Sequence, residues 1–178
     1  MTESVFDQSR YQLRFDWGVA GLRRLAPADV VVVIDVLRFS STVSARVAAG
    51  EAVPHDETAH TVSRNGAAVA AAVGPDAVVL LGCLRNASAV ARTVLAEQAR
   101  RGARTSVNVI AAGELAGAGA DAELRFAVED HLGAGAVFGA LEALGVDHSS
   151  PEAAAASESF RGLRAAARHL LTASGSGQ

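Results

Sequence analysis

Lysine is absent from this chain of 178 residues, and cysteine occurs only once. Without lysine, neither Schiff-base chemistry nor a lysine nucleophile is available, and every basic side chain is an arginine. The single cysteine, Cys83, excludes an internal disulfide and fits a reducing compartment. Aromatic residues make up only 4% of the chain, so the core has to be built from Val, Leu and Ala with close backbone approach.

Long apolar runs and a strong charge of one sign are also missing. The apolar stretches are short and interrupted by charge, which excludes a membrane span. The first residues, MTESVFDQSRYQLRFDW, are polar and do not resemble a secretory signal. The net charge of -3 is scattered along the sequence, so no basic stripe for nucleic acid is present. We therefore expect a cytoplasmic protein that binds neither membranes nor nucleic acid.

The order of apolar and amphipathic segments indicates the fold class. Continuous β-branched or apolar runs predict buried strands at 29–36, 77–81 and 106–111, and helical patterns follow them. This alternation predicts one α/β domain over residues 1–178, a layered α/β/α structure with a largely parallel or mixed central sheet. We also expect the following secondary features: a half-exposed strand at 11–15, helices at 42–49, 56–73 (in part), 87–101, 126–144 and 151–172, a short strand at 52–54, a flexible loop at 113–121, and a disordered tail at 173–178.

The strand at 29–36 ends in unusual chemistry. Asp35, Arg38 and the hydroxyls of residues 40–42 follow five apolar residues. An ion pair between Asp35 and Arg38 with simple helix capping would explain the pattern. Alternatively, the guanidinium and the helix N-terminus would bind an anion beside a metal held by Asp35. Composition alone leaves the two interpretations about even.

A second segment resembles this one. VVVIDVLRFSSTVSA at 31–45 aligns without gaps with VVLLGCLRNASAVAR at 78–92, which matches Arg38 with Arg85 and Ser41 with Ser88. Two such βα units would place both arginines at the carboxyl ends of strands, where open α/β sheets bind ligands. The similarity is suggestive of a duplication without establishing one.

Several motifs together resemble the 2-phosphosulfolactate phosphatase family, in the order that the family has them. They are DVLRFSSTVSA followed by Gly50 and Pro54, SRNGA at 63–67, GCLRNASAVA at 82–91, AAGE at 111–114, and LRFAVEDHLGAGAVFGAL at 124–141. RFDWGVAG near the N-terminus is similar to actinobacterial members, and the resemblance extends over roughly residues 10–172.

The resemblance implies a Mg²⁺-dependent phosphatase on the family's own α/β fold. Asp35 would hold Mg²⁺ with Glu129 or Asp130, which point about 100° apart on a helix, so that one faces the site and the other supports it. Arg38, with Arg85, would neutralise the phosphoryl charge. The substrate-binding set implied is Ser41, Asn65, Arg85, Asn86 and Glu114.

The chain also departs from the family pattern. Its middle section is short, Ala67 replaces a hydroxyl in the Asn-Gly block, and it stops soon after the last predicted helix. The charged centre is retained, which favours a changed substrate over a lost activity. The hypotheses are therefore a hydrolase of a small anionic phosphate ester, a lyase or cyclase that reuses the pocket, and a non-catalytic ligand-binding protein. We expect a homodimer. His55 and His60 are interpreted as part of a solvated loop, with a role for His55 as general base left open.

Overall fold

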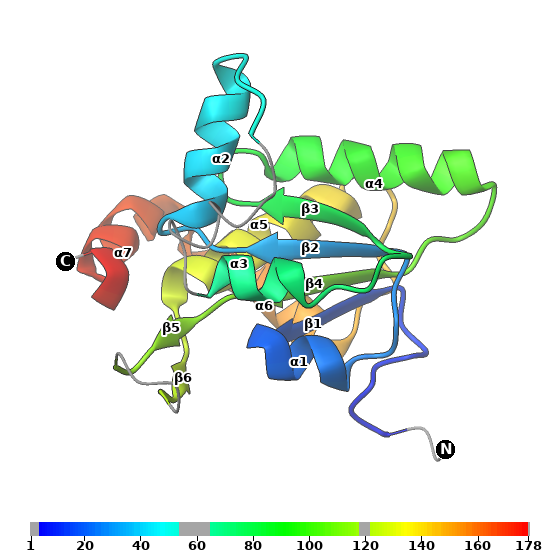
Figure 1. The fold of residues 1–178 in the computed structure, drawn as a ribbon, viewed down its shortest axis with the longest axis horizontal. Coiled ribbons are helices and arrows are strands. Elements are labelled where there is room, and N and C mark those ends of the chain that lie inside the picture. The colour runs from blue at the N-terminus through cyan, green and yellow to red at the C-terminus, as the bar shows by residue number, and fades with distance from the viewer. Residues whose placement is uncertain (1–3, 54–64, 118–121, 178) are drawn as a thin grey trace.

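The computed structural model describes residues 4–53, 65–117 and 122–177. Figure 1 shows a sheet with helices packed on both faces. The strands are β1 (Leu13–Trp17), β2 (Val30–Ile34), β3 (Val78–Gly82), β4 (Val107–Ala111), β5 (Glu114–Leu115) and β6 (Leu124–Arg125). The α-helices are α1 (Gly18–Arg24), α2 (Phe39–Ala48), α3 (Gly66–Ala71), α4 (Ala87–Arg101), α5 (Val128–Glu142), α6 (Pro151–Leu163) and α7 (Ala167–Ala173), and short 3-10 turns occupy Arg164–Ala166 and Gly175–Gly177.

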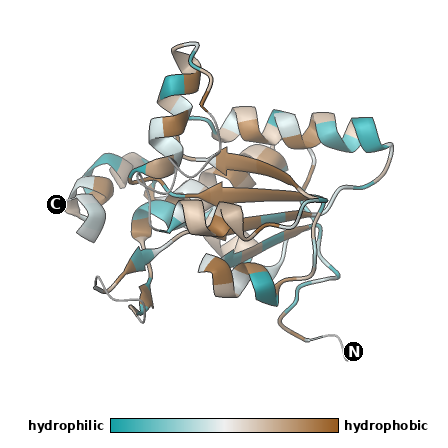
Figure 2. Cartoon of the chain, viewed as in Figure 1, coloured by the Kyte–Doolittle hydropathy of each residue, from teal (hydrophilic) through white to brown (hydrophobic). Residues whose placement is uncertain are grey.

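The main sheet has four strands in the order β1-β4-β2-β3, and all neighbours run parallel. All five residues of β2 are buried, as are all five of β4, because helices cover both faces of these central strands. The four-stranded parallel sheet with helices on both sides confirms the predicted α/β class. β2 and β3 are drawn almost entirely in the brown of apolar residues in Figure 2.

The two faces of β2 belong to two separate apolar clusters. Val30, Val32 and Ile34 pack against α4, α5 and α6, whereas Val31 and Val33 pack against α1 and α3. This division follows from the alternation of side chains along a strand. In Figure 1, α1 and α3 lie in front of the sheet and α5 and α6 behind it.

Glycine allows the close helix packing that a core poor in aromatics needs. A Cβ atom at Gly135 of α5 would lie 2.2 Å from the carbonyl oxygen of Ala156 in α6, so the two backbones touch at this point. A Cβ atom at Gly139 of the same helix would meet only the Ser157 hydroxyl, at 3.9 Å. The contact at Gly135 therefore fixes the separation of α5 and α6.

Most predicted elements are present, but the helix α1 was not predicted, and the 3-10 turn Arg164–Ala166 interrupts the helix expected at 151–172. There are four further differences. Glu114–Leu115 pairs antiparallel with Leu124–Arg125, in the segment predicted to be a loop. β3 is an edge strand of intermediate burial and not a fully buried one. Residues 52 and 53 form no strand. The segment at 173–178, predicted to be disordered, has the 3-10 turn Gly175–Gly177 among its described residues.

Two other predicted features can be compared with the structure. The helix start at Ser150 is confirmed, because its hydroxyl accepts the N–H of Ala153 with Pro151 in the first turn. Residues 54–64, which hold half of the helix expected at 56–73 together with His55 and His60, lie outside the described residues. No helix in the described ranges has the length and apolarity needed to cross a membrane.

Replacing Gly135 with alanine is expected to lower the free energy of unfolding by about 1–3 kcal/mol, because α5 and α6 must move apart. The matched Gly139→Ala should be neutral or raise it by up to about 1 kcal/mol, since alanine favours the helix and meets no close atom. Urea denaturation of both variants measures the difference. Equal effects of the two substitutions would contradict the close contact.

Candidate functional site

The carboxyl ends of β2 and β4 form the natural place for a site in this sheet. The connection that follows β2 includes α3, which packs on one face of the sheet, whereas the connection that follows β4 includes α5, which packs on the other face. Adjacent parallel strands whose connections diverge in this way open a crevice at their carboxyl ends. Figure 1 shows the arrowheads of β2 and β3 pointing toward the starts of α2 and α5.

A cavity of about 260 Å³ lies at this crevice and contains five of the side chains predicted to form the site. We call it the acidic cavity. Its lining residues are Asp35, Leu37, Arg38, Asn65, Gly113, Leu115, Gly117, Glu129, Asp130 and Ser176. Residues from four of the family-like motifs thus converge on one space, although they are spread from Asp35 to Asp130.

The carboxylate of Asp130 joins the ends of the two central strands. Its Oδ1 accepts the backbone N–H of Val36 at 2.7 Å, and its Oδ2 accepts that of Gly113 at 2.9 Å. The carbonyl of Gly113 in turn accepts the side-chain amide of Asn65 at 2.7 Å. Asp130 and Asn65 therefore position the backbone that surrounds the acidic cavity.

Burial strongly affects the protonation of Asp130. The side chain is 3% exposed, and this desolvation raises its pKa well above the ordinary aspartate value. The N–H groups of Val36 and Gly113 oppose the shift, while the charges of Asp35 and Glu129 add to it. Asp35 and Glu129 are thus close enough to influence the ionisation of Asp130.

Asp35 is held at the start of α2 by local hydrogen bonds. Its Oδ1 accepts the backbone N–H of Phe39 at 3.2 Å, which orients the carboxylate at the positive end of the helix. The Ser40 hydroxyl accepts the N–H of Asp35 and donates to the carbonyl of Val33. A Cβ atom at Gly66 would lie 2.6 Å from Asp35 Oδ2, so only glycine lets α3 approach so closely. Gly66 of the Asn-Gly block is therefore packed directly against the aspartate.

Glu129 differs from its neighbour Asp130. It is 2% exposed, yet its Oε2 is buried without a hydrogen-bond partner among the described residues. A buried carboxylate oxygen without a partner is costly, so such an atom indicates a missing ligand or water. Glu129 lies in the first turn of α5, where the helix dipole favours a negative charge. It is the strongest candidate for direct contact with a bound cation.

Arg38 is the guanidinium that borders the acidic cavity. It is exposed and forms no ion pair with Asp35, so the simple ion-pair interpretation of the strand end is wrong for these two side chains. Its planar guanidinium can therefore bind an anionic ligand at the opening of the acidic cavity.

The internal similarity of the two βα units is real in structure but shifted by one residue. β2 and β3 pair Ile34 with Gly82, an offset of 48 residues (82 − 34) and not the 47 of the ungapped alignment. Cys83 therefore corresponds to Asp35. The Asn86 side chain accepts the N–H of Cys83 and donates to the carbonyl of Leu81, which is what Ser40 does in the first unit. The Leu-Arg pairs of the two units are consequently not equivalent.

The other predicted substrate-binding residues lie outside the acidic cavity. The side-chain amide of Asn86 accepts one hydrogen bond through its oxygen and donates one through its nitrogen, and both partners are backbone groups of its own turn. Ser41 and Arg85 line a neighbouring cavity. Glu114 accepts a hydrogen bond from Ser176 at 3.1 Å and lies 3.5 Å from the guanidinium of Arg125. Sequence reasoning missed Leu37 and Ser176, since neither carries a chemical signal of its own.

The donor set fits Mg²⁺ bound through two carboxylates. Asp130 already uses each of its oxygens on a backbone N–H, and in the described ranges no group of three or more His, Cys, Asp or Glu side chains is arranged for a metal. Mg²⁺ in enzymes commonly takes one or two carboxylates and keeps several waters. Asp35 and Glu129, whose Oε2 has no hydrogen-bond partner among the described residues, match that requirement, which makes Glu129 the better candidate of the two adjacent carboxylates predicted to join Asp35.

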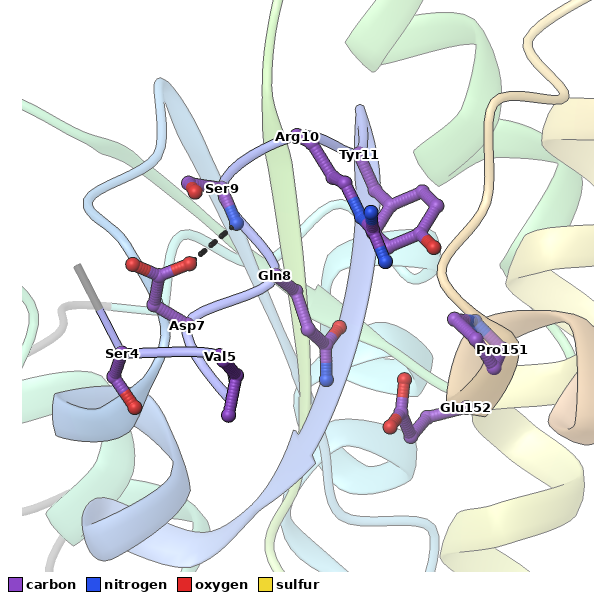
Figure 3. A pocket seen from close by; sticks show the side chains of 9 residues that line it. All are labelled: Ser4, Val5, Asp7, Gln8, Ser9, Arg10, Tyr11, Pro151 and Glu152. Atoms are coloured by element: carbon purple, nitrogen blue, oxygen red, sulfur yellow. Dashed lines mark hydrogen bonds between the residues drawn. The ribbon is translucent and has the colours of Figure 1, made fainter.

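Two cavities near the N-terminal segment also have carboxylates and an arginine in their described lining, but none of these carboxylates is buried. Figure 3 shows one between the N-terminal segment and the start of α6, into which Gln8 and Glu152 point. Asp7 there accepts the N–H of Ser9 within its own turn. A further cavity is bordered by Trp17 and His131, whose rings stack in an aromatic cluster, and burial lowers the pKa of His131. His131 thus has a packing role in the described structure.

Asp130→Asn is expected to lower the free energy of unfolding by about 1–3 kcal/mol near pH 4, because one of two buried N–H groups loses its acceptor. The raised pKa of Asp130 means that folding binds a proton above the ordinary value of 3.8. The free energy of unfolding of the wild type therefore falls as the pH rises from about 3.8 through the folded-state pKa of Asp130. The asparagine variant has no ionisable group at this position and lacks this pH dependence.

Urea denaturation from pH 4 to pH 8 in chelator checks this, with the exposed Asp147→Asn as control. The difference in the free energy of unfolding between wild type and Asp130→Asn should become smaller as the pH rises. An advantage that grows with pH would show that the folded-state pKa is lowered instead.

Comparison with known proteins identifies the family. The family model described as 2-phosphosulpholactate phosphatase matches residues 51–178, which include Asn65, Glu129 and Asp130. Asp35 and Arg38 precede the matched residues and join them only in the acidic cavity. No curated protein matches the sequence. The chain belongs to the 2-phosphosulpholactate phosphatase family.

Proposed function

We propose that this chain is a Mg²⁺-dependent hydrolase of a small anionic phosphate ester. One observation carries the proposal: buried Asp35 and Glu129 meet exposed Arg38 at a single cavity, and Glu129 Oε2 has no hydrogen-bond partner among the described residues. Carboxylates that can hold a cation next to a guanidinium that can hold a phosphoryl group are the parts that phosphoryl transfer requires. Membership of a phosphatase family supports the same reaction class.

The roles of the side chains follow from their positions. Arg38 would bind two phosphoryl oxygens through its fork and stabilise the charge that develops during transfer. Asp35 and Glu129 would hold Mg²⁺, which supplies charge neutralisation and activation of water. Asp130 and Asn65 act on the backbone of Val36 and Gly113 and keep the cavity in shape. In the overall reaction water cleaves the ester, and phosphate and the alcohol leave.

Ser41 is not needed as a nucleophile in this scheme. It lines the neighbouring cavity and not the acidic one, so its hydroxyl is not placed beside the carboxylates. Attack by water therefore fits the positions of the side chains better than a covalent serine intermediate.

Asp35→Asn and Glu129→Gln should each reduce Mg²⁺-dependent phosphate release by on the order of 100-fold, because each removes a carboxylate that can hold the cation. Release would be measured on a panel of small phosphate esters with Mg²⁺ and with chelator. Asp147→Asn, an exposed change of the same type, should retain wild-type rates. Full activity of either site variant in chelator would refute the Mg²⁺ role.

Arg38→Gln should reduce kcat by on the order of 100-fold, since the guanidinium stabilises charge mainly in the transition state. Arg92→Gln on the exposed side of α4 is the matched control and should have no effect. Steady-state kinetics on the best ester of the panel separates kcat from KM. A change in KM alone would limit Arg38 to ground-state binding.

A further inference from the structure

The C-terminal segment of the chain lies beside the carboxyl ends of the strands. It consists of α7 (Ala167–Ala173) and the 3-10 turn Gly175–Gly177, and Figure 1 shows it at the red end of the colour bar, beyond the arrowheads of β2 and β3. Two of its side chains line cavities there. Ser176 lines the acidic cavity, and Leu171 lines the neighbouring cavity that also contains Arg38. The segment therefore forms part of the wall of both spaces.

Few contacts hold this segment on the rest of the molecule. α7 has no buried residue, and residues 161–166, which precede it, are all exposed. Leu171 is half-buried and packs against one of the two apolar clusters, and the Ser176 hydroxyl donates to Glu114 Oε1 at 3.1 Å. A Cβ atom at Gly175 would lie 2.6 Å from Glu114 Oε2, so the backbone also touches this carboxylate. Segments with so little buried surface open at a lower free energy than the core.

Glu114 is the fixed partner in these contacts. It belongs to β5, whose pairing with β6 holds its backbone, and its other oxygen lies 3.5 Å from the guanidinium of Arg125. The next residue of the strand, Leu115, lines the acidic cavity together with Ser176. The hydrogen bond between Ser176 and Glu114 therefore joins two parts of the cavity wall that come from distant segments.

The charge of the C-terminal segment suits a cover for an acidic space. Residues 164–177 carry two arginines and one histidine but no acidic residue. The cavity that this segment borders holds the buried carboxylates of Asp35, Glu129 and Asp130. Opposite charges attract, and an anion bound at Arg38 would add to the attraction between the site and the segment.

We propose that residues 167–177 form a lid over the acidic cavity, which opens at residues 161–166 and closes through Ser176 when a ligand is bound. The inference rests on the proposed function only for the ligand, which is a phosphate anion with Mg²⁺. The open lid would admit the substrate and release the products. The closed lid would exclude bulk water from the space around Arg38 and strengthen the attraction between charges there. Ser176 is thus a positioning residue that acts through the lid.

Hydrogen exchange of the full chain tests the lid without a need for turnover. Amides of residues 167–177 should exchange on the order of tenfold faster than those of α6, because α7 has no buried residue. Inorganic phosphate with Mg²⁺ should slow this exchange by about fivefold, since a ligand of the closed form stabilises it, and should leave α6 unchanged. Ser176→Ala should abolish most of the slowing. The control Ser159→Ala removes an exposed hydroxyl that bonds only within α6 and should keep the slowing.

The outcomes separate the lid from the proposed function. Calorimetric binding of phosphate with no change in the exchange of residues 167–177 would overturn the lid and leave the anion site standing. Exchange of these residues as slow as that of α6 without ligand would also overturn it. Without phosphate binding the proposed function fails, and thiol labelling decides the lid. Leu115→Cys in a Cys83→Ala background should react about threefold faster when Ser176→Ala is added, because the closing hydrogen bond is lost, and an equal rate would overturn the lid.

Discussion

The structure around the site depends on one buried carboxylate that accepts two backbone N–H groups. Asp130 ties the segment after β2, through Val36, to the segment after β4, through Gly113. Since the two strands send their connections to opposite faces of the sheet, their ends would otherwise diverge. Asn65 extends the link by donating to the carbonyl of Gly113, so the start of α3 joins the same network.

This arrangement concentrates negative charge in a place where it is costly. Asp35, Glu129 and Asp130 are all buried, and each of the first two raises the pKa of the third. Like charges so close in a poorly solvated space repel one another unless a cation or a proton is present. Backbone N–H groups compensate Asp130 and partly compensate Asp35, whereas the described residues offer no partner to Glu129 Oε2. The imbalance itself makes the site suitable for a divalent cation.

The limits of prediction at this site have physical causes. Sequence identified Asp35, Arg38, Asn65, Glu129 and Asp130, which the acidic cavity brings together, because charged and amide groups next to apolar runs are conspicuous. Arg85 was expected beside them, but it lines a neighbouring cavity, and the pairing of β2 with β3 is shifted by one residue from the ungapped alignment. A shift of one residue changes which side chain occupies a given place in a βα turn, and no pattern in a single sequence reports it. The division of labour between Glu129 and Asp130 was likewise undecided, since adjacent helical positions are equivalent in sequence.

By itself the sequence determined the parallel α/β class, the helix start at Ser150, and the residues that carry charge at strand ends. These follow from local rules: β-branched runs need cover on both faces, and a hydroxyl before proline caps a helix. Only the tertiary structure decided the strand order, the approach of Gly66 to Asp35, and the use of Asp130 to join two loops. It also decided that leucines from three distant segments share one cavity. Such contacts depend on how distant segments pack, and packing has no signature at the level of neighbouring residues.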